Sequence, residues 1–382
     1  MFQLDEEQRL ILQSVREIVQ REIRPQAATL DETGEFPWNA VRIFAKNDIL
    51  NSLLPRKYGG VEVSYFTFCM IVEEITKACA SSALLVITQA EGTLPIVYGG
   101  DEHLKEKYLS RLAGNSQILT ALGTPEPSDG SEIPSLKIEA VLRGKKYIIN
   151  GEKCLIKNGS IADFLVLYAH TDPPKGDYGM SAFVVEKGFP GLIYGRNEDG
   201  MGMRGCPRSE IFMEDLEVPG ENLIGKEGEG FSNMMKTRSL SQLFTAAQGV
   251  GLAQGAMEEA ITYARKRVQF GKPISHMAPI QFMIADMAAG VESARLLTYQ
   301  AAFLFDREDW KKATTHAAMA KFMASDTAMK ATTDAVQIMG GYGYTKEYPV
   351  ERMMRDAKLT QVHTGTNQVI RLSVARDLTG RS

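Results

Sequence analysis

Apolar and polar positions divide the chain into three parts. Near the start, apolar residues recur three or four positions apart, at Leu10, Ile11, Val15, Ile18, Val19 and Ile23. This spacing predicts a helix with one buried face, and Pro25 marks where it ends. The pattern favours a second helix over 39–46. It also favours a buried helical pair over 66–97, where the sequence is rich in Ala, Ile and Leu. The first third is therefore predicted to be helical.

Short β-type runs replace this pattern in the middle third of the chain. They cover 146–149, 164–169, 181–185 and 210–213, with turn residues between them. Asn150-Gly151 stands between two apolar runs, which predicts a β-hairpin at that point. Because Pro and Gly recur throughout, the middle third is predicted to form a β-sandwich or barrel.

Helical patterns return in the last third, over 231–265, 276–305, 310–340 and 350–378. Helices, then strands, then helices predict an α+β fold whose helical and β parts are segregated. We expect an N-terminal helical domain (1–118), a middle β domain (119–229) and a C-terminal four-helix bundle (230–382).

Composition narrows the possible functions. The 382 residues include 43 Lys and Arg against 47 Asp and Glu, a net charge of −4 that argues against nucleic-acid binding. An apolar content of 44% argues against disorder. The four cysteines are scattered without a Cys-x-x-Cys pair, so neither a metal site nor a disulfide framework is predicted. The acidic start lacks a secretory pattern, and no run reaches the roughly 20 uncharged apolar residues of a membrane span. We expect a cytoplasmic protein without membrane insertion.

General sequence motifs add little. No phosphate-binding loop, zinc-protease helix or serine-hydrolase elbow is present. Gly249-Val250-Gly251 lies inside a predicted helix without a preceding strand. Close packing of two helices explains these glycines better than a dinucleotide-binding turn does.

Longer strings are far more specific, and they occur in a characteristic order. They read Gly-Met-Arg-Gly-Cys-Pro (202–207), Gly-Lys-Glu-Gly-Glu-Gly-Phe (225–231), Arg-Val-Gln-Phe-Gly-Lys-Pro-Ile (267–274), Gln-Ile-Met-Gly-Gly-Tyr-Gly-Tyr (337–344), Pro-Val-Glu-Arg (349–352), Arg-Asp-Ala (355–357) and Gly-Thr-Asn-Gln (365–368). Together they resemble the acyl-CoA dehydrogenase family over essentially the whole chain. The resemblance implies an FAD-dependent oxidoreductase acting on CH–CH groups. Such enzymes remove the α-hydrogen of an acyl-CoA as a proton and the β-hydrogen as a hydride.

The resemblance also implies which residues contact FAD. The FAD pyrophosphate needs cationic and N–H donors, and glycine permits close backbone approach. The positions that match family contacts to FAD are Ser131, Arg267, Phe270, Gln337, Gly340, Gly341, Thr366 and Gln368. The 337–343 segment matches one that relatives extend to a neighbouring subunit, so we expect a homotetramer, with a hetero-oligomer as the alternative.

Three departures from the family pattern affect the flavin site. The family threonine that meets the flavin edge is replaced by Pro125, which has no hydrogen-bond donor. A ring-covering tryptophan is replaced by Leu155, and a flavin-facing threonine by Lys157. Lys157 has two open interpretations: a cation beside the flavin that favours its reduced anionic form, or a solvated lysine.

A further departure concerns the catalytic base. The usual glutamate position holds Thr364, next to His363, and the alternative glutamate position on the opposite helix holds Ser241. Proton abstraction beside a thioester needs a desolvated carboxylate, which threonine and serine lack. The Thr364 N–H can still polarise the thioester carbonyl. An arginine of the family is replaced by Gln242. Arg238, Ser241, Gln242 and Gly365 match the substrate-facing positions.

Three interpretations of the missing base remain open. Glu91 aligns with an apolar residue that lines the acyl pocket in relatives, and some relatives acting on alicyclic acyl-CoAs use an acid on this helix. His363 is a second candidate, and the third interpretation is that no base exists. We therefore carry two hypotheses: a dehydrogenase or reductase of an unusual, cyclic or branched acyl-CoA with electron-transfer flavoprotein as partner, or a catalytically silent or elimination-type homologue.

Overall fold

The computed structural model describes residues 4–114, 116–127 and 136–380. The N-terminal part is helical, as predicted. Its helices are α1 (Glu6–Ile18), α2 (Ala27–Thr33), α3 (Trp38–Lys46), α4 (Tyr65–Thr76), α5 (Ala80–Gly99) and α6 (Glu102–Leu109). The predicted helical pair over 66–97 corresponds to α4 and α5, both of which are almost entirely buried.

The middle part contains the strands β1 (Thr120–Gly123), β2 (Glu139–Arg143), β3 (Lys146–Lys157), β4 (Phe164–His170), β5 (Met180–Glu186), β6 (Leu192–Asn197), β7 (Arg208–Pro219) and β8 (Leu223–Ile224). They are joined in the order β6-β7-β3-β2-β4-β5-β8, and β1 pairs with β4. A single residue pair, Glu139 with His170, links β2 to β4 and divides the strands into two halves. Side chains from both halves form one shared apolar core, in agreement with the predicted sandwich.

The Asn150-Gly151 prediction was wrong. These residues lie inside β3, where the pairing register with β7 shifts between Ile149 and Gly151. The hairpin occurs earlier, between Arg143 and Lys146, and Gly144 supplies the positive φ of its turn. Asn-Gly thus marks a bulge here, because Gly151 adopts a φ of 145° that permits the irregular register.

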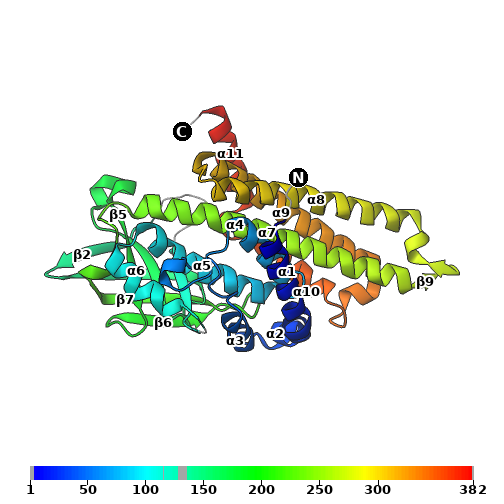
Figure 1. Cartoon of the computed structure of the whole chain (residues 1–382), viewed down its shortest axis with the longest axis horizontal. Coiled ribbons are helices and arrows are strands. Elements are labelled where there is room, and N and C mark those ends of the chain that lie inside the picture. The colour runs from blue at the N-terminus through cyan, green and yellow to red at the C-terminus, as the bar shows by residue number, and fades with distance from the viewer. Residues whose placement is uncertain (1–3, 115, 128–135, 381–382) are drawn as a thin grey trace.

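The C-terminal part consists of long helices: α7 (Gly230–Lys266), α8 (Ala278–Asp306), α9 (Trp310–Met339), α10 (Val350–Val362) and α11 (Asn367–Thr379). A small hairpin of β9 (Val268–Gln269) and β10 (Lys272–Pro273) follows α7 and lies at the far end of the molecule from the sheet (Figure 1). The helix predicted over 350–378 is in fact two helices. Thr364 and Gly365 both have positive φ, which breaks the helical path between α10 and α11.

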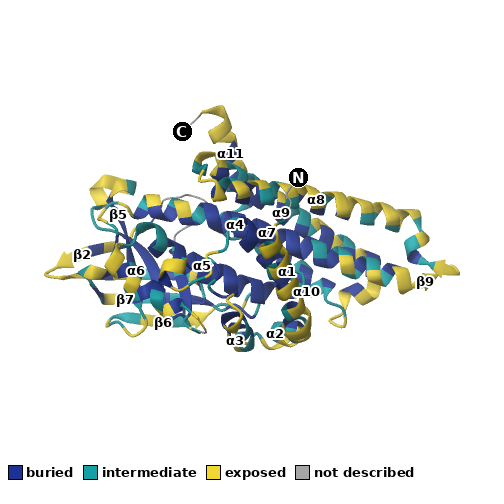
Figure 2. Cartoon of the chain, in the orientation of Figure 1, coloured by how far each residue is buried: buried dark blue, intermediate teal, exposed yellow. Residues whose placement is uncertain are grey.

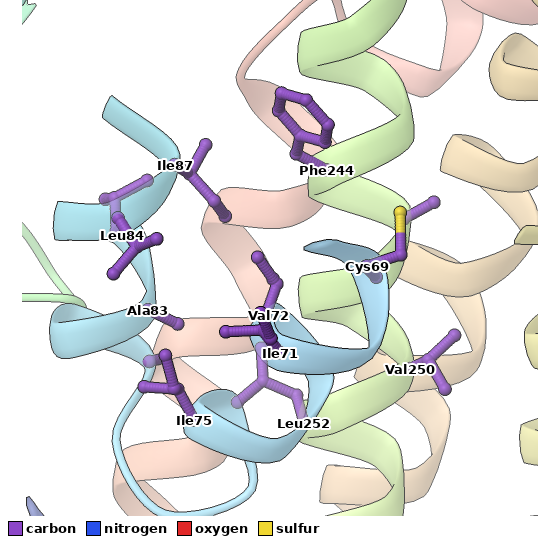
Figure 3. Close-up of a cluster of buried hydrophobic side chains, with 14 of the residues drawn as sticks. Cys69, Ile71, Val72, Ile75, Ala83, Leu84, Ile87, Phe244, Val250 and Leu252 are labelled. Carbon is purple, nitrogen blue, oxygen red and sulfur yellow. The ribbon is translucent and has the colours of Figure 1, made fainter. Parts of the chain in front are cut away.

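The helical parts share one apolar core, which Figure 3 shows where α4, α5 and α7 meet. A Cβ added to Gly249 would lie 2.9 Å from the backbone of Ala324, and one added to Gly251 would lie 2.6 Å from the Glu73 carbonyl oxygen. The predicted role of this glycine pair in close helix packing is therefore confirmed. Figure 2 shows the buried residues concentrated along these central helices.

Helix α5 is long and apolar enough to cross a membrane by length and composition alone. In this structure 94% of its apolar window is buried inside the protein. It is the core helix that connects the N-terminal part to the β sheet. This placement matters because α5 carries the single acidic residue of the apolar stretch, Glu91.

Candidate active site

Glu91 is buried at the centre of the molecule, with only 1% of the residue exposed. Two residues earlier, its helix is fixed against β1, because the Gln89 side chain accepts a hydrogen bond from Thr120 N over 2.9 Å. The Thr120 hydroxyl in turn donates to the Gln89 carbonyl. Gly92 allows this approach, since an added Cβ would lie 2.5 Å from the Thr120 hydroxyl. The expected burial of Glu91 is confirmed.

Lys157 is the direct partner of Glu91. Its ammonium nitrogen lies 2.5 Å from Oε2 of the carboxylate, and the two side chains are 17% and 2% exposed. Of the two interpretations of Lys157, the solvated lysine is therefore wrong. An ionised carboxylate inside a protein needs such compensation, because removing an isolated charge from water is costly.

The end of β3 places Lys157 in this position. Leu155 and Asn158 both have positive φ, an uncommon conformation for residues other than glycine. The pairing of β3 with β7 shifts between Lys153 and Ile156 and then resumes with Lys157 opposite Arg208. Backbone irregularities of this kind are concentrated at functional sites, where the surrounding structure holds them in place.

His363 lies close to this ion pair. Burial lowers the pKa of His363 well below its ordinary value, and the nearby charges of Lys157, Lys321 and Arg208 lower it further. Its Nε2 atom lies 3.4 Å from the Thr245 hydroxyl, whereas Nδ1 is buried and has no partner among the described residues. The imidazole is therefore neutral at physiological pH.

Thr364 and Gly365 form the bend after α10. The Thr364 carbonyl oxygen accepts a 3.4 Å hydrogen bond from the Gln242 side chain on α7. The Gly365 carbonyl oxygen accepts a 2.7 Å hydrogen bond from Lys321 on α9. Within the described ranges, no residue accepts a hydrogen bond from the Thr364 N–H. That donor is consequently available to a ligand.

Arg238 and Ser241 occupy the neighbouring turn of α7. Arg238 points at the bend, because a Cβ added to Gly365 would lie 2.8 Å from its guanidinium. Burial lowers the pKa of Arg238, and no carboxylate of the described residues forms an ion pair with it. Ser241 is buried, and its carbonyl oxygen accepts from the Thr245 hydroxyl. The structure thus brings together all of the predicted catalytic and substrate-facing residues.

Sequence reasoning missed Lys321, which is completely buried. Besides Gly365, it donates to the Asn367 side chain over 2.9 Å and so fixes the bend to α9. Burial lowers the pKa of Lys321 to about 7, an effect that Asp326 opposes and Arg238 reinforces. One signal was present in the sequence: Lys321 stands in an alanine-rich part of its helix, where a solvated lysine is out of place.

The other predicted FAD residues gather at the opposite end of the helical bundle. An open hollow of about 610 Å³ is lined there by Arg267, Phe270, Gly340 and Gly341, among others. Phe270 and Gly271 form the two-residue turn of the β9–β10 hairpin, both with positive φ, and Phe270 is 92% exposed. Gln337 is also exposed, at the end of α9. A cation, an aromatic ring and open backbone suit a nucleotide cofactor.

The two groups of residues are far apart within one chain. Thr245 and Lys266 are 21 residues apart on α7. At the helical rise of 1.5 Å per residue, this corresponds to about 30 Å. The two groups of residues in one chain therefore cannot contact the same part of a single FAD molecule.

The remaining predicted FAD contacts, Thr366 and Gln368, lie at the start of α11, directly after the bend at Thr364 and Gly365. Thr366 caps α11, where its side chain accepts from Val369 N, and the exposed Gln368 follows two residues later. Ser131 lies outside the described residues. Pro125 stays close to β3, because its carbonyl oxygen accepts a 3.1 Å hydrogen bond from Cys154 N. Among the described residues, no group of three or more His, Cys, Asp and Glu side chains could hold a metal ion.

Comparisons with known proteins show which family the chain resembles. Models of the N-terminal, middle and C-terminal domains of acyl-CoA dehydrogenases match residues 5–116, 121–216 and 228–379. The chain is 58% identical to a cyclohex-1-ene-1-carbonyl-CoA dehydrogenase of Geobacter metallireducens, with 99% of each chain covered. It is 55% identical to a protein of that name from Syntrophus aciditrophicus, covering 99% of this chain and 91% of the relative.

A solved structure shares the fold over its full length. Butyryl-CoA dehydrogenase from Megasphaera elsdenii superposes with a TM-score of 0.95 at 36% identity, with 99% of this chain and 100% of that chain covered. The matches to all three domains, at this level of identity, leave one conclusion. The chain belongs to the acyl-CoA dehydrogenase family of FAD-dependent oxidoreductases acting on CH–CH groups.

Proposed function

We propose that this enzyme dehydrogenates a cyclic acyl-CoA that already carries a ring double bond next to the thioester, with Glu91 as the base. The observation that carries the proposal is the position of the carboxylate. Glu91 projects from α5 into the centre of the molecule, whereas the usual base positions hold Thr364 and Ser241. The relatives named cyclohex-1-ene-1-carbonyl-CoA dehydrogenases support the class of substrate.

The chemistry of such a substrate explains a relocated base. In a 1-ene-1-carbonyl thioester the α-carbon is part of the double bond and has no hydrogen to lose. The acidic hydrogens are those at the γ-carbon, because the resulting negative charge is delocalised through the double bond onto the thioester oxygen. A base must therefore face the γ-carbon rather than the α-carbon. A carboxylate on a different helix from the usual one meets this requirement.

The proposed reaction balances as follows. The γ-C–H bond breaks, its proton passes to the Glu91 carboxylate, and its electron pair enters the conjugated system. A second ring C–H bond then loses a hydride, which leaves a further double bond in the ring. When bound, FAD supplies the acceptor for that hydride.

The bend at Thr364 and Gly365 is proposed to bind the thioester. The available Thr364 N–H is a donor for the thioester oxygen, where negative charge develops. Arg238, Ser241 and Gln242 border the bend on α7, and we propose that they and Gly365 line the CoA-thioester channel. Arg238, with no acidic partner in the described ion pairs, is the candidate for an anionic group of CoA.

The residues at the far end of the bundle are proposed to hold the FAD of a second copy of the chain. Arg267 would pair with the pyrophosphate, Phe270 would cover the nucleotide, and Gln337, Gly340 and Gly341 would lie against it. The fit is supported by the hollow itself, where a Cβ added to Gly340 or Gly341 would meet no atom within 4 Å. Thr366 and Gln368, together with Ser131 and Lys157, would contact the chain's own FAD.

This arrangement requires an oligomer, and we propose the homotetramer indicated by the family resemblance. Electron-transfer flavoprotein is the proposed redox partner, since electrons must leave FAD after each turnover. A cytoplasmic location stays a prediction.

The test of the proposed function is Glu91→Gln, which keeps the shape of the side chain but removes the proton acceptor. Reduction of bound flavin by cyclohex-1-ene-1-carbonyl-CoA should slow by about 10²-fold or more. Flavin absorbance and sedimentation should match the wild type. Glu106→Gln, at an exposed glutamate of α6, is the matched control and should reduce flavin normally. Reduction of the Glu91→Gln protein at the wild-type rate would disprove the assignment.

A catalytically silent or elimination-type homologue is the second candidate. It is favoured by the ion pair itself, because a carboxylate held by an ammonium is a weaker base than a free one. His363→Asn tests the remaining candidate base and should slow reduction less than Glu91→Gln does. A wild-type protein with bound FAD that no cyclic acyl-CoA reduces would establish the second candidate.

A further inference from the structure

The Glu91–Lys157 contact is the closest polar contact of the candidate site. Among the described residues, Lys157 is the only hydrogen-bond partner of the Glu91 side chain, and Glu91 is the only one of Lys157. Both groups lie away from bulk solvent, and the carboxylate is 2% exposed. Such a pair is strongly coupled, because removing one partner leaves an uncompensated charge in the interior.

The other groups around the pair do not replace Lys157. His363, from the bend after α10, is kept neutral by burial and by the cations near it. Cys206 lies within reach of the charges of Arg208, Lys157 and Glu91, and burial raises its pKa, so it stays a neutral thiol. Arg208, beside Lys157 on β7, donates to the Gly202 carbonyl. The direct compensation of the Glu91 charge therefore comes from Lys157.

The backbone presents Lys157 in a fixed direction. The residue on its C-terminal side, Asn158, has a φ of 58°, and its N–H donates to the Pro207 carbonyl over 2.9 Å. Together with the register between Lys157 and Arg208, this bond fixes the end of β3 on β7. A lysine on an anchored strand end loses less freedom on pairing than a lysine on a loop.

We propose that Lys157 is a positioning residue for the base: it compensates the charge of the buried Glu91 carboxylate, holds that carboxylate directed at the acyl pocket, and remains beside the negative charge that proton transfer moves onto the substrate. This inference rests on the proposed function of Glu91.

The balance of charge explains the benefit. Before proton transfer the pocket holds a carboxylate, an ammonium and a neutral thioester. Afterwards it holds a neutral carboxylic acid, the same ammonium and a conjugated thioester anion. The reaction moves one negative charge from Glu91 to the substrate, and the fixed ammonium of Lys157 compensates that charge in both states. Fixed charges aimed at developing charge are the largest source of catalysis in many enzymes.

Lys157→Met removes the ammonium while keeping much of the side-chain volume. We expect flavin reduction to require a higher pH, with the acid limb of the pH–rate profile displaced upward by about 1 to 3 pH units. Lys157→Arg should restore most of the wild-type profile. Lys153→Met is the matched control, since Lys153 lies on the same strand in another buried ion pair, with Glu126. It should lower stability without moving the profile.

A second measurement is independent of activity. In the Lys157→Met protein the unpaired carboxyl group binds a proton more readily when folded than when unfolded, so stability falls as pH rises. The difference in melting temperature from wild type should widen between pH 5 and pH 8. In the double variant Glu91→Gln/Lys157→Met the difference should no longer depend on pH.

The outcomes separate this inference from the proposed function. Suppose that Glu91→Gln slows flavin reduction, but Lys157→Met leaves the pH–rate profile unmoved and its stability difference from wild type is constant with pH. This result overturns the role of Lys157 and leaves Glu91 as the base. If the stability difference between Lys157→Met and wild type widens with pH, but Glu91→Gln does not slow flavin reduction, the proposed function is overturned. A displaced profile that Lys157→Arg restores and Lys153→Met does not reproduce supports both.

Discussion

The centre of the molecule and the far end of its helical bundle are built in opposite ways. At the centre, Glu91 and Lys321 are buried and Lys157 is half-buried, and each has a defined partner. At the far end, Arg267 and Phe270 are exposed, and Gly340 and Gly341 face open space. Polar groups withdrawn from water are normally paired within the chain, whereas exposed groups need no partner.

The contrast indicates which chemistry each region can perform by itself. The centre is complete enough to hold a base, orient it and exclude water. The far end has a cation, an aromatic ring and bare backbone around a hollow, and no element of the described residues covers it. We thus propose that proton transfer is a property of one chain, whereas cofactor retention is a property of the assembly. Three predictions test this division.

Arg267→Ala should have the largest effect and should act on the cofactor alone. Charge-assisted hydrogen bonds contribute about 1.5 to 3 kcal/mol, so the dissociation constant for FAD should rise about 10- to 100-fold. With FAD in excess, flavin reduction should proceed at close to the wild-type rate. Fluorescence titration of the apoprotein with FAD measures the first effect. The control is Arg265→Ala, at an exposed arginine two residues earlier. Equal FAD affinities in the two variants would contradict the assignment of Arg267 to the FAD pyrophosphate.

Gly92→Ala and Gly341→Ala form a matched pair across the two regions. At Gly92 the new methyl group meets Thr120 and the Ala121 nitrogen at 2.5 to 2.8 Å, on the helix turn that carries Glu91. Overpacking of this kind costs about 1 to 3 kcal/mol, less the small gain of alanine in a helix. At Gly341 there is no neighbour within 4 Å. Urea unfolding should therefore show a clear loss for Gly92→Ala and little change for Gly341→Ala, where only FAD affinity should fall.

Lys321→Met should change the pH dependence of stability, the smallest of the three effects. The pKa of Lys321 is lowered by burial from 10.5 to about 7. Between these values the unfolded chain binds a proton that the folded chain does not, so wild-type stability should rise with pH across this window. Below about pH 7 both states are protonated and the contribution is constant. Melting temperatures at pH 7 and pH 9 should show a flatter dependence for the variant; an identical slope would mean that Lys321 stays charged when folded.

The sequence predicted more of the fold than of the site. Helical periodicity located α1, α3, α4 and α5, because their buried faces follow from local spacing. The burial of Glu91 was predictable for the same reason, since its neighbours along the helix are apolar. Asn150-Gly151 was misleading, because a glycine with positive φ serves a bulge as readily as a turn.

What local pattern could not provide was the pairing of distant residues. Glu91 and Lys157 are 66 positions apart and meet only when α5 packs across the end of β3. Each residue is by itself a departure from the family pattern, and only the fold joins the two. Lys321 reaches the bend after α10 from another helix in the same way. The separation of the FAD residues into two groups likewise follows from the length of α7, which a list of matching positions does not reveal.

About 30 Å along α7 separates the far end of each bundle from the candidate site of the same chain. If the far end of each bundle serves the site of a neighbouring chain, two different loss-of-function alleles can rescue one another. Chains carrying Glu91→Gln lack the proposed base, and chains carrying Arg267→Ala lose FAD when the cofactor is limiting, so each is defective alone under that condition. In mixed assemblies, a site that takes its base from the second chain and its far-end arginine from the first contains no substitution. Co-expression should recover a fraction of wild-type activity that neither allele has, whereas two alleles altered at the same end should fail to complement.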